Sequence, residues 1–598
     1  MAHARHRQAA SGAAERQRAG RDALPVLLAT LAALGISAIA GFPKLAFPGS
    51  DNDSLMRLVE VRDLLAGQGW FDLHQYRMGA EGGLAMHWSR LVDAPIAGLI
   101  LVFKPLVGQP QAELAAKFIW PASTMAAALW FIVKAARRLG GDAARLPALA
   151  LGATALHFLS IFVPGSLDHH NVQLALILAV AAGLAAGSFA AGLGAGAAAA
   201  ASLAIGMETI PYVAAAAAAV VLLLAWRGAA DVPVASGFGA GFAGAAALLL
   251  LITIRPSQWP AAACDAFSGA QAGQAMLGGL GLAAVAHLYG EAGRWRRLGA
   301  LAGLAAASAL YLAIVYPQCL APPYPDLDAR LRTLWLDRVS EAQPLWALVF
   351  DNPAAAALYY VTPLIALALT AARIAREGLD PARAIVGLML LAAFAVSLWQ
   401  LRGASFSVAL ATLPLAAWVG GLRSRHAARP SAAGSLRLAG AWLASFNVVW
   451  GLAAAQIAAI TAAAPTGTID AERCETALSY KALAELAPGT VAAVSNLGAP
   501  ILAFTGHRTL AGPYHRNVAG NAAVLDLATA VPAAARDIAA RHGIDYVAVC
   551  PGNPESLFLA GQAPDGLLAR LAEGETPDWL EPAAGGTGTG LAVYRRVR

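Results

Sequence analysis

An aspartate and two histidines interrupt an otherwise apolar part of the chain, in the stretch GSLDHHNV (165–172). Carboxylate oxygens and imidazole nitrogens both bind divalent cations. Asp168 and His170 are two residues apart, so a turn could bring both side chains to one ion. The alternative is that Asp168 only caps the helix that begins near residue 171. We favour the metal site, because an isolated acid at a membrane face is costly unless it has a function.

Two further aspartates stand in DND (51–53), within the long segment 44–112. Apolar residues follow Asp53 at helical spacing, so Asp51 and Asp53 could both cap a helix. The other interpretation is a metal site, because Mg²⁺ and Mn²⁺ accept one or two carboxylates together with a substrate phosphate. This stretch alone does not decide between the two.

A third acidic region is LWLDRVSEAQPLW (334–346), which contains Glu341. Asp326, Asp328 and Asp337 precede Glu341, so the sequence alone does not select one acid as functional. All four could equally be solvated residues of a loop.

Two isolated charges lie at the ends of apolar runs. Glu208 stands in AIGMETIPYV, and Arg402 stands between two such runs in SLWQLRGASF. Arg402 could extend to lipid headgroups. It could instead bind a phosphate, for which a fixed guanidinium fork is well suited.

These polar groups must be positioned by membrane helices. Of the 598 residues, 58% are hydrophobic and only 13% are charged, whereas about a quarter are charged in soluble proteins. Apolar runs that approach or reach the length needed to cross ~30 Å of hydrocarbon recur through the first 460 residues. We therefore expect a polytopic membrane protein. The net charge of +6 does not indicate a nucleic-acid partner, because most Lys and Arg lie in short loops, where they orient helices.

The positive-inside rule gives a topology. Thirteen apolar runs lie near 23–43, 113–134, 144–163, 172–188, 190–206, 208–226, 236–254, 274–290, 297–316, 354–372, 381–401, 403–422 and 436–462. A fourteenth candidate, 94–108, is short and is interrupted by Lys104 and Pro105. If it does not cross, all five basic clusters are cytoplasmic, at 4–21, 134–145, 293–297, 373–383 and 423–437. We therefore expect thirteen crossings, with the N-terminus inside and the C-terminus outside.

This topology puts the candidate residues on one side. The segments that face outside are 44–112, 164–171, 255–273, 317–353 and 463–598. The four cysteines also lie there, in a compartment that permits disulfides. Four cysteines allow three connectivities, and four free thiols remain an equal alternative. Our suggested pairing is Cys264–Cys319 and Cys474–Cys550.

After about residue 463, the long apolar runs end and the sequence predicts alternating helices and strands. Three short stretches are typical of strands: GTVAAVSN, IDYVAVC and GLAVYRRV. The stretch between the first two, AAVLDLATAVPAAARDIAARHG, is typical of a helix. Short buried strands that flank a helix predict a small, partly parallel sheet. The loop APILAFTGHRTLAGPYHRN (499–517) is basic and aromatic. It could contact an anionic sugar or a lipid phosphate, or it could be an ordinary structured loop.

Together the motifs resemble the catalytic subunit of the oligosaccharyltransferases, within the GT-C superfamily of membrane glycosyltransferases. NDSLMRLVEVRDLLAG (52–67) is similar to the first-loop motif of that family, GSLDHHNV to its second, DxD-like motif, and VSEAQP (339–344) to its SVSEHQP signature. The three occur in the family order, and the resemblance covers roughly residues 20 to 460. It implies a thirteen-crossing layout with a C-terminal outer domain.

The resemblance also implies roles for individual residues. Asp53, Asp168 and His170 correspond to metal ligands, and Asp53 and Glu341 to catalytic residues that face the acceptor. The donor-phosphate arginine of the family falls on Ser407 here, so we assign the phosphate to Arg402 from its location. The remaining candidates for the site are Asp51, His169, Glu208, His87, His515 and Arg516.

One departure from the family concerns the acceptor. The peptide-reading WWD motif is absent, and the only Trp after residue 463 is Trp579. Transfer from a lipid-linked sugar therefore remains the expectation, whereas peptide N-glycosylation is disfavoured.

The predicted organisation is a basic cytoplasmic leader (1–22), a GT-C transmembrane catalytic domain (23–462) and a small extracytoplasmic α/β domain (463–598). We expect transfer of a sugar or glycan from a polyprenyl-phosphate-linked donor to a glycan, lipid or protein acceptor, outside a bacterial inner membrane, with Mg²⁺ or Mn²⁺. One alternative is a ligase that moves a whole glycan en bloc. A transporter or flippase is disfavoured, because the charges crowd one face and no internal repeat is seen.

Overall fold

The structure is a computed structural model that describes residues 22–321, 327–461, 474–584 and 590–597. Residues 1–21 of the predicted basic leader, and Asp326, lie outside the described residues. Within them, every predicted apolar run coincides with a helix, and the last run coincides with two. The first of these helices is Asp22–Ile39.

The main helices of the helical region follow the predicted runs closely. They are α5 (Gln109–Gly140), α6 (Arg145–Phe158), α7 (His170–Ala186), α8 (Phe189–Ile205), α9 (Ile210–Arg227), α10 (Val232–Thr253), α11 (Gly269–Tyr289), α12 (Arg294–Val315), α15 (Pro353–Glu377), α16 (Pro381–Trp399), α17 (Gly403–Ala428), α18 (Ala432–Ser445) and α19 (Asn447–Thr461). Short elements connect them: η2 (Asp142–Ala144), η3 (Met207–Thr209), η4 (Gly228–Asp231), η5 (Pro256–Gln258), η6 (Pro317–Leu320), α13 (Ala329–Leu334), η7 (Leu336–Arg338), η8 (Ser340–Ala342) and α14 (Leu345–Asp351).

The number of membrane crossings differs from the expectation. Among the described residues, seven helical segments are long and apolar enough to span a membrane, or eight if the pair α18 and α19, bent by 79°, forms one span. One of the seven, Met207–Thr253, contains both α9 and α10. The helices α7 and α8 have only 17 residues each, slightly fewer than the ~20 that cross a bilayer upright. The predicted count of thirteen is therefore not confirmed.

Glycine lets two of these helices approach closely. A Cβ atom at Gly241 of α10 would lie 2.0 Å from the carbonyl oxygen of Leu193 in α8, and one at Gly196 would lie 2.1 Å from that of Phe238. Such contact between backbones is typical of helices that pack in lipid. There is no hydrophobic driving force between helices in lipid, and small residues allow the close van der Waals packing that stabilises the pair. The same Ala and Gly residues weaken the hydropathy signal of the sequence.

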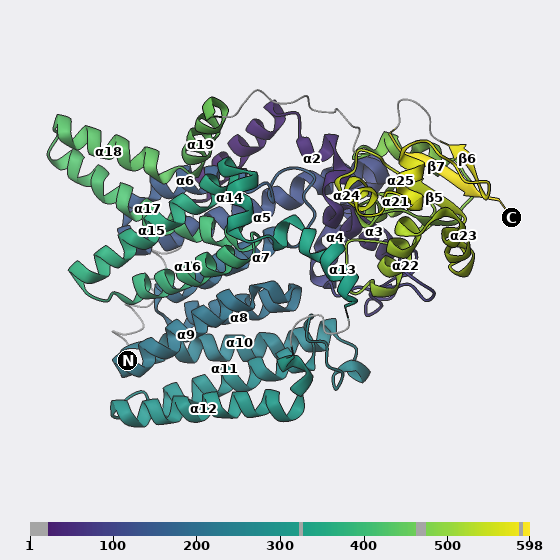
Figure 1. Cartoon of the computed structure of the whole chain (residues 1–598). Helices are drawn as coiled ribbons and strands as arrows, with labels where there is room; N and C mark the ends of the chain where they lie inside the picture. The colour runs from purple at the N-terminus through teal and green to yellow at the C-terminus, as the bar shows by residue number, and fades with distance from the viewer. Residues whose placement is uncertain (1–21, 322–326, 462–473, 585–589, 598) are drawn as a thin grey trace.

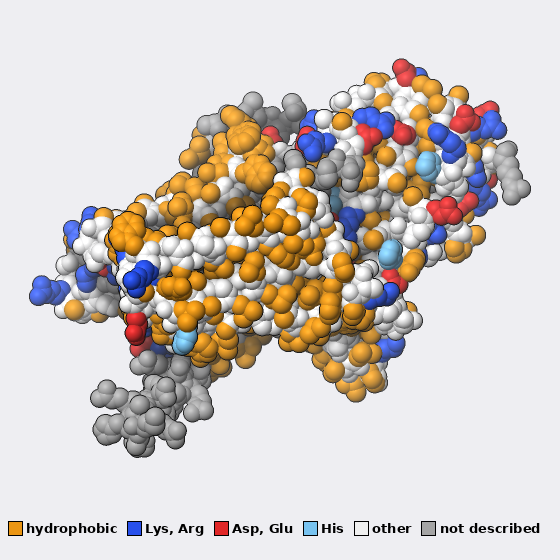
Figure 2. Space-filling view, turned by 90° about the horizontal axis from the view of Figure 1, so that it is seen from below, with side chains coloured by type: hydrophobic (Ala, Val, Ile, Leu, Met, Phe, Trp, Pro, Cys, Tyr) orange, Lys and Arg blue, Asp and Glu red, His pale blue; other side chains and the backbone are white. Residues whose placement is uncertain are grey.

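The outer surface agrees with a membrane location. Figure 2 shows hydrophobic side chains spread over the helical region, whereas charged side chains gather on the C-terminal region and at the opposite end of the molecule. A continuous apolar surface of this extent is expected where helices contact lipid rather than water.

The first connecting segment folds over one end of the helices. It contains α2 (Pro43–Ala46), η1 (Pro48–Ser50), α3 (Asn52–Leu65), β1 (His74–Gln75), β2 (Leu84–Ala85) and α4 (Arg90–Val107). Helix α4 is the fourteenth apolar run, and it is not among the candidate spans. A buried ion pair joins α3 to α4, since Arg57 Nη1 lies 2.6 Å from Asp93 Oδ1. This pair fixes the orientation of the helix that carries Asp53.

The C-terminal region contains a five-stranded mixed sheet in the order β4-β3-β5-β7-β6. Its elements are η9 (Ala477–Tyr480), α20 (Lys481–Ala484), β3 (Thr490–Ala492), η10 (Ser495–Leu497), α21 (Gly498–Phe504), β4 (Arg508–Thr509), α22 (Val518–Thr529), α23 (Pro532–Arg541), β5 (Tyr546–Val549), α24 (Pro554–Gln562), α25 (Leu567–Ala572), β6 (Leu580–Ala584) and β7 (Ala592–Arg596). Strand β3 is parallel to β4 and to β5, whereas β7 is antiparallel to β5 and β6.

The single helix predicted for residues 522–543 is two helices. Helix α22 ends at Thr529 and α23 begins at Pro532. Proline disfavours the helical conformation of the residue before it, and Val531 is extended, with ψ of 150°. Both suggested disulfides are present, Cys264–Cys319 and Cys474–Cys550.

The C-terminal region is joined firmly to the first segment. Figure 1 shows its green and yellow elements at one end of the molecule, over α3 and α4. Arg62 of α3 donates to the carbonyl oxygen of Ala503 at 2.8 Å, and Met78 forms a parallel bridge with Thr509 of β4. Leu331 of α13 is 2% exposed and belongs to the hydrophobic core of the C-terminal region. Polar segments from three parts of the chain are thereby held around one space.

Candidate active site

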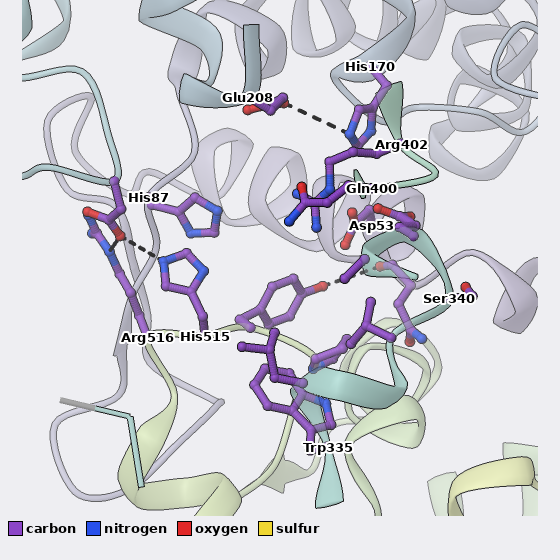
Figure 3. A pocket seen from close by; sticks show the side chains of 18 of the residues that line it. Asp53, His87, His170, Glu208, Trp335, Ser340, Gln400, Arg402, His515 and Arg516 are labelled. Carbon is purple, nitrogen blue, oxygen red and sulfur yellow. Dashed lines mark hydrogen bonds and ion pairs between the residues drawn. The ribbon is translucent and has the colours of Figure 1, made fainter. Parts of the chain in front are cut away.

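A large cavity lies between the helical region and the C-terminal region, with a volume of about 2380 Å³. Its wall includes the start of α3, the turn before α7, the turn before α9, the loop that carries Glu341, and the turn between α16 and α17. Figure 3 shows that Asp53, His170, Glu208 and Arg402 surround the same space. Residues predicted from motifs that are far apart in the sequence therefore meet in one cavity.

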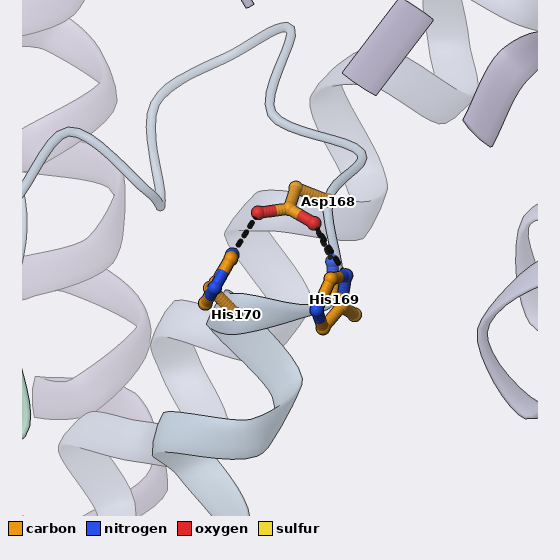
Figure 4. A group of neighbouring side chains, drawn as sticks. All are labelled: Asp168, His169 and His170. Carbon is orange, nitrogen blue, oxygen red and sulfur yellow. Dashed lines mark hydrogen bonds and ion pairs between the residues drawn. The ribbon is translucent and has the colours of Figure 1, made fainter. Parts of the chain in front are cut away.

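Asp168 is the centre of the most compact polar group. Its Oδ1 lies 2.6 Å from His169 Nδ1, and its Oδ2 contacts His170 Nδ1. Figure 4 shows the carboxylate lying across the two imidazoles at the start of α7. Ligand atoms of the three residues lie within 4.8 Å of one another. The alternative that Asp168 caps α7 does not hold, because the N-cap residue is His169 and no side chain caps this helix.

Glu208 extends this group from the turn before α9. Its Oε1 lies 2.9 Å from His169 Nε2 and 3.9 Å from His170 Nε2. His169 thus bridges Asp168 and Glu208, which gives this residue a contact to both acids. His170 was the predicted metal ligand and His169 an accessory candidate, whereas in the structure both imidazoles contact Asp168.

Asp51 and Asp53 have different environments although they are two residues apart. Asp51 is the N-cap of α3, because its side chain accepts a hydrogen bond from the Ser54 N–H at 3.1 Å, and it also pairs with Lys44. The capping interpretation therefore applies to Asp51. The Asp53 carboxylate accepts no hydrogen bond from the described part of the chain. Burial, together with the negative charges of Asp168 and Glu341, raises the pKa of Asp53 to about 8.

Glu341 and Arg402 come from two segments whose backbones are joined. The Arg402 N–H donates to the Glu341 carbonyl oxygen at 3.1 Å, and the Leu401 N–H donates to that of Gln343 at 2.9 Å. Both side chains line the cavity. The Arg402 Nε is buried without a hydrogen-bond partner among the described residues, so this guanidinium retains a donor for a ligand.

The other acids near Glu341 have separate positions. Asp337 also lines the cavity. Asp328 instead caps α13 and pairs with Arg330, whose guanidinium reaches Asp526 of the C-terminal region at 2.6 Å. Among these acids, Glu341 has a negative charge that raises the pKa of Asp53.

A second polar group lies elsewhere on the cavity wall. Arg516 Nε and Nη2 each donate to the Asp265 carboxylate at 2.7 Å, and His515 Nε2 lies 2.7 Å from the same group. His87 packs on His515 with 4.5 Å between ring centroids. The contacts from His515 and Arg516 hold the pKa of Asp265 well below its usual range, despite its partial burial. Burial lowers the pKa of His87.

Two residues at these groups, Asp265 and Trp88, were not predicted from the sequence. Asp265 is a single acid after Cys264, with no motif around it. Trp88 lies under the Arg57 guanidinium, 4.3 Å from the ring centroid, and packs on His169 at 5.6 Å and on Tyr514 at 5.5 Å. Their types were visible in the sequence, but their proximity to the site depends on tertiary packing.

The donor set of the Asp168 group fits a divalent cation. Asp53, Asp168 and Glu341 are three acids that crowd one region, and their mutual repulsion is what raises the pKa of Asp53 beyond the effect of burial. The contacts from Asp168 to His169 and His170 each need a proton on an imidazole nitrogen. A cation that binds carboxylate oxygen and imidazole nitrogen could replace these protons and offset the negative charge.

Solved structures with the same arrangement of elements exist. The chain superposes on the archaeal oligosaccharyltransferase AglB from Archaeoglobus fulgidus, in complex with an inhibitory peptide and a dolichol-phosphate, with a TM-score of 0.63 and 14% identity. The match covers 95% of this chain and 74% of that one. The chain has the oligosaccharyltransferase fold. The resemblance predicted from three short motifs is therefore confirmed at the level of the fold.

Two further structures of the Archaeoglobus fulgidus oligosaccharyltransferase give the same result. Its apo form matches with a TM-score of 0.62 and 15% identity, over 90% of this chain and 72% of that one. Its complex with Zn and sulfate matches with a TM-score of 0.58 and 15% identity, over 96% and 73%. No family model and no curated protein matches the sequence.

Proposed function

We propose that the protein is a membrane glycosyltransferase that transfers a sugar or glycan from a polyprenyl-phosphate-linked donor to an acceptor, on the extracytoplasmic face and with the help of a divalent metal. The observation that carries this proposal is the convergence of Asp53, Asp168, His170, Glu341 and Arg402 on one cavity. The oligosaccharyltransferase fold supports it independently, because an archaeal structure with this fold was solved with a dolichol-phosphate.

The proposed reaction is a direct displacement at the anomeric carbon of the donor. The attacking oxygen or nitrogen of the acceptor forms the new bond, and the bond from carbon to phosphate oxygen breaks. Its electron pair leaves with the lipid phosphate, and the proton of the acceptor is taken by Asp53, with Glu341 beside it. Such a reaction inverts the configuration of the sugar.

The metal would be held by Asp53, Asp168 and His170. It would supply positive charge for the phosphate oxygen on which negative charge develops. Glu208 and His169 would orient this group, since Glu208 contacts His169 and His169 contacts Asp168. Mg²⁺ or Mn²⁺ is the proposed ion, and the Zn complex of the archaeal structure supports a divalent cation in this fold without selecting one.

Arg402 would bind the lipid phosphate. It stands between α16 and α17, where the membrane helices end at the cavity, and it has an unpaired donor. A guanidinium matches phosphate oxygens with two parallel hydrogen bonds, which a lysine does not. A headgroup held there would have its sugar in the cavity and its hydrocarbon chain against the helices.

The test uses envelope glycans of a strain that carries Asp53→Asn or Arg402→Lys in place of the native protein. Mass spectrometry should show loss of one glycan or of one sugar residue, with accumulation of the lipid-linked donor. A glycan profile identical to that of the native strain, with normal levels of both variants in the membrane, would sink the proposal.

A second candidate function is en bloc transfer of a whole glycan. The cavity volume of about 2380 Å³ favours it, because pockets for small molecules occupy roughly 300–1,000 Å³. Purified protein should be given lipid-linked donors with one sugar and with several sugars. Transfer of the long donors alone would favour en bloc transfer, whereas transfer of the single sugar supports the first proposal.

A further inference from the structure

The C-terminal region faces the cavity with the end of its sheet at which the parallel strands finish. Strands β4, β3 and β5 are parallel, so their carboxyl ends lie at the same end of the sheet. Every residue that this region contributes to the cavity wall follows one of these ends. Asn496 follows β3, residues 513–519 follow β4, and Pro554, Glu555 and Phe558 follow β5.

The order of the strands makes this end of the sheet a typical ligand-binding site. From β3 the chain crosses to β4 on one side, and it then returns to β5 on the other side of β3. In open sheets with parallel strands, ligands bind outside the carboxyl ends of the strands, where the direction of the crossovers changes. Here that point lies between β3 and β5, between the segments that carry Asn496 and Glu555.

The groups at this point are held rigidly. Glu555 accepts hydrogen bonds from the Ser495 N–H at 3.1 Å, the Ser495 hydroxyl at 2.9 Å and the Asn496 N–H at 2.9 Å. These bonds join the segment after β5 to the segment after β3. The disulfide Cys474–Cys550 fixes the residue that directly follows β5. A preorganised wall of this kind reduces the entropy cost of binding a ligand.

The adjoining loop supplies an aromatic side chain. Trp335 is half-buried, lines the cavity, and lies away from Glu208 and His170 in Figure 3. Three residues later, Arg338 lies over the Phe558 ring of α24 at 4.4 Å, which brings this loop beside the segment after β5. The side chain of Asn496 makes no hydrogen bond to the described residues, so its amide has donors and an acceptor for a ligand.

An extended peptide does not suit this wall. Peptides commonly add a strand to an exposed sheet edge. The edge strand near the cavity, β4, is already covered, because the Thr509 N–H donates to Arg77 and its carbonyl oxygen accepts from Gly79. The other edge strand, β6, contributes no described residue to the cavity wall.

We propose that the carboxyl ends of β3 and β5, with Trp335, form a carbohydrate-binding subsite, and that the acceptor of this enzyme is therefore a glycan. This inference rests on the proposed glycosyltransferase function and names its acceptor class. The amide of Asn496 and the spare lone pairs of Glu555 bind sugar hydroxyls, which are both donors and acceptors. The indole face of Trp335 covers the apolar C–H face of a sugar ring. A sugar hydroxyl of the bound glycan then attacks the donor carbon in the displacement described above.

The test is binding of the purified full-length protein, in detergent, to an array of neutral oligosaccharides. The competing class is peptides that carry NVT, the sequon of the acceptor peptide tethered to the Archaeoglobus fulgidus oligosaccharyltransferase. Trp335→Ala and Asn496→Ala should each lower the glycan signal, by about tenfold for Trp335→Ala. Trp346→Ala is the matched control, because Trp346 lies in α14 of the same segment between α12 and α15, is 65% exposed and does not line the cavity. It should bind like the native protein.

The array separates this inference from the proposed function. Asp168→Asn should retain glycan binding although it stops transfer, because the subsite does not include the metal group. Absence of glycan binding by the native protein, equal binding by Trp335→Ala and Asn496→Ala, or binding of the peptides alone would each overturn the inference. Thermal unfolding of each variant checks that a lost signal is not lost folding.

Discussion

Two polar groups line the same cavity, and they differ in how their charges are balanced. Around Asp265, the guanidinium of Arg516 and the ring of His515 neutralise one carboxylate through direct contacts. Around Asp168, four carboxylates share one region with two imidazoles: Asp53, Asp168, Glu208 and Glu341 lie near His169 and His170. The Asp53 carboxylate has no hydrogen-bond donor among the described residues. The contacts within the Asp265 group neutralise its carboxylate, whereas the Asp168 group has more negative charge than its neighbouring groups offset.

This difference distinguishes a structural contact between two segments from the proposed reaction centre. The Asp265 group connects the loop after β4 to the segment after α10, so its contacts serve the position of the C-terminal region. An excess of buried negative charge, by contrast, is costly unless a cation is bound. Perturbed carboxylates in a cavity are also typical of functional sites. The two groups can therefore be distinguished by equivalent substitutions.

The largest difference is expected between Asp168→Asn and Asp265→Asn. Both substitutions remove one negative charge from the cavity wall. Asp168→Asn should lower sugar transfer by at least about a hundredfold, because the metal that would stabilise the charge on the leaving phosphate loses a ligand. Asp265→Asn should lower transfer by less than about tenfold. The measurement is the rate of transfer in membranes that contain equal amounts of each protein.

Equal losses for the two variants would contradict the comparison. Asp142→Asn is a suitable control, because Asp142 is exposed and lies in the turn between α5 and α6, outside the cavity wall. Its rate of transfer should equal that of the native protein.

Metal removal should act on one group alone. A chelator is expected to stop transfer, and Mg²⁺ or Mn²⁺ should restore it. Added metal should raise the thermal unfolding midpoint of the native protein, because a ligand that binds the folded state stabilises it. At a hundredfold excess over the dissociation constant, the free energy of unfolding increases by about 2.7 kcal/mol. Asp265→Asn should keep this rise and Asp168→Asn should lose it. Transfer that continues unchanged in the chelator would exclude a metal role.

The sequence was more informative about the Asp168 group than about the Asp265 group. Asp53, Asp168 and Glu341 each stand in a short motif, and the charges of the loops suggested that all three share one side. Asp265 has no motif, and its partners His515 and Arg516 are 250 and 251 residues away in the sequence. Contacts at such separations depend on how the C-terminal region docks, which no local pattern records.

The fold shows the same division between local and tertiary information. Helix positions were predictable from the apolar runs, and α4, which the positive-inside rule led us to exclude as a crossing, is not among the candidate spans. The number of crossings was not predictable, since α7 and α8 are short and rich in Ala and Gly. Strand β4 has only two residues, and it exists because β3 and Met78 pair with it.

A moderate effect is expected on the acid stability of the Asp265 group. The folded pKa of Asp265 lies below its unfolded value of about 3.8, so the contacts with Arg516 and His515 stabilise the fold above that pH and this contribution is lost as the pH falls below it. Asp265→Asn should therefore lower the free energy of unfolding by about 2 kcal/mol at neutral pH. The difference from the native protein should shrink towards pH 3. A difference that is constant between pH 7 and pH 3 would contradict this account.

The smallest effect is expected at Asp51, the immediate neighbour of the proposed site. Asparagine is as good an N-cap as aspartate. Asp51→Asn should therefore keep the start of α3, with a change in the free energy of unfolding within about 0.5 kcal/mol and a rate of transfer within about threefold of the native rate. Asp53→Asn makes the same chemical change two residues later, and it should lower transfer by at least about a hundredfold. If both variants lost transfer equally, the charge of the whole turn would matter rather than one ligand, and the difference between a capping acid and a metal-binding acid would disappear.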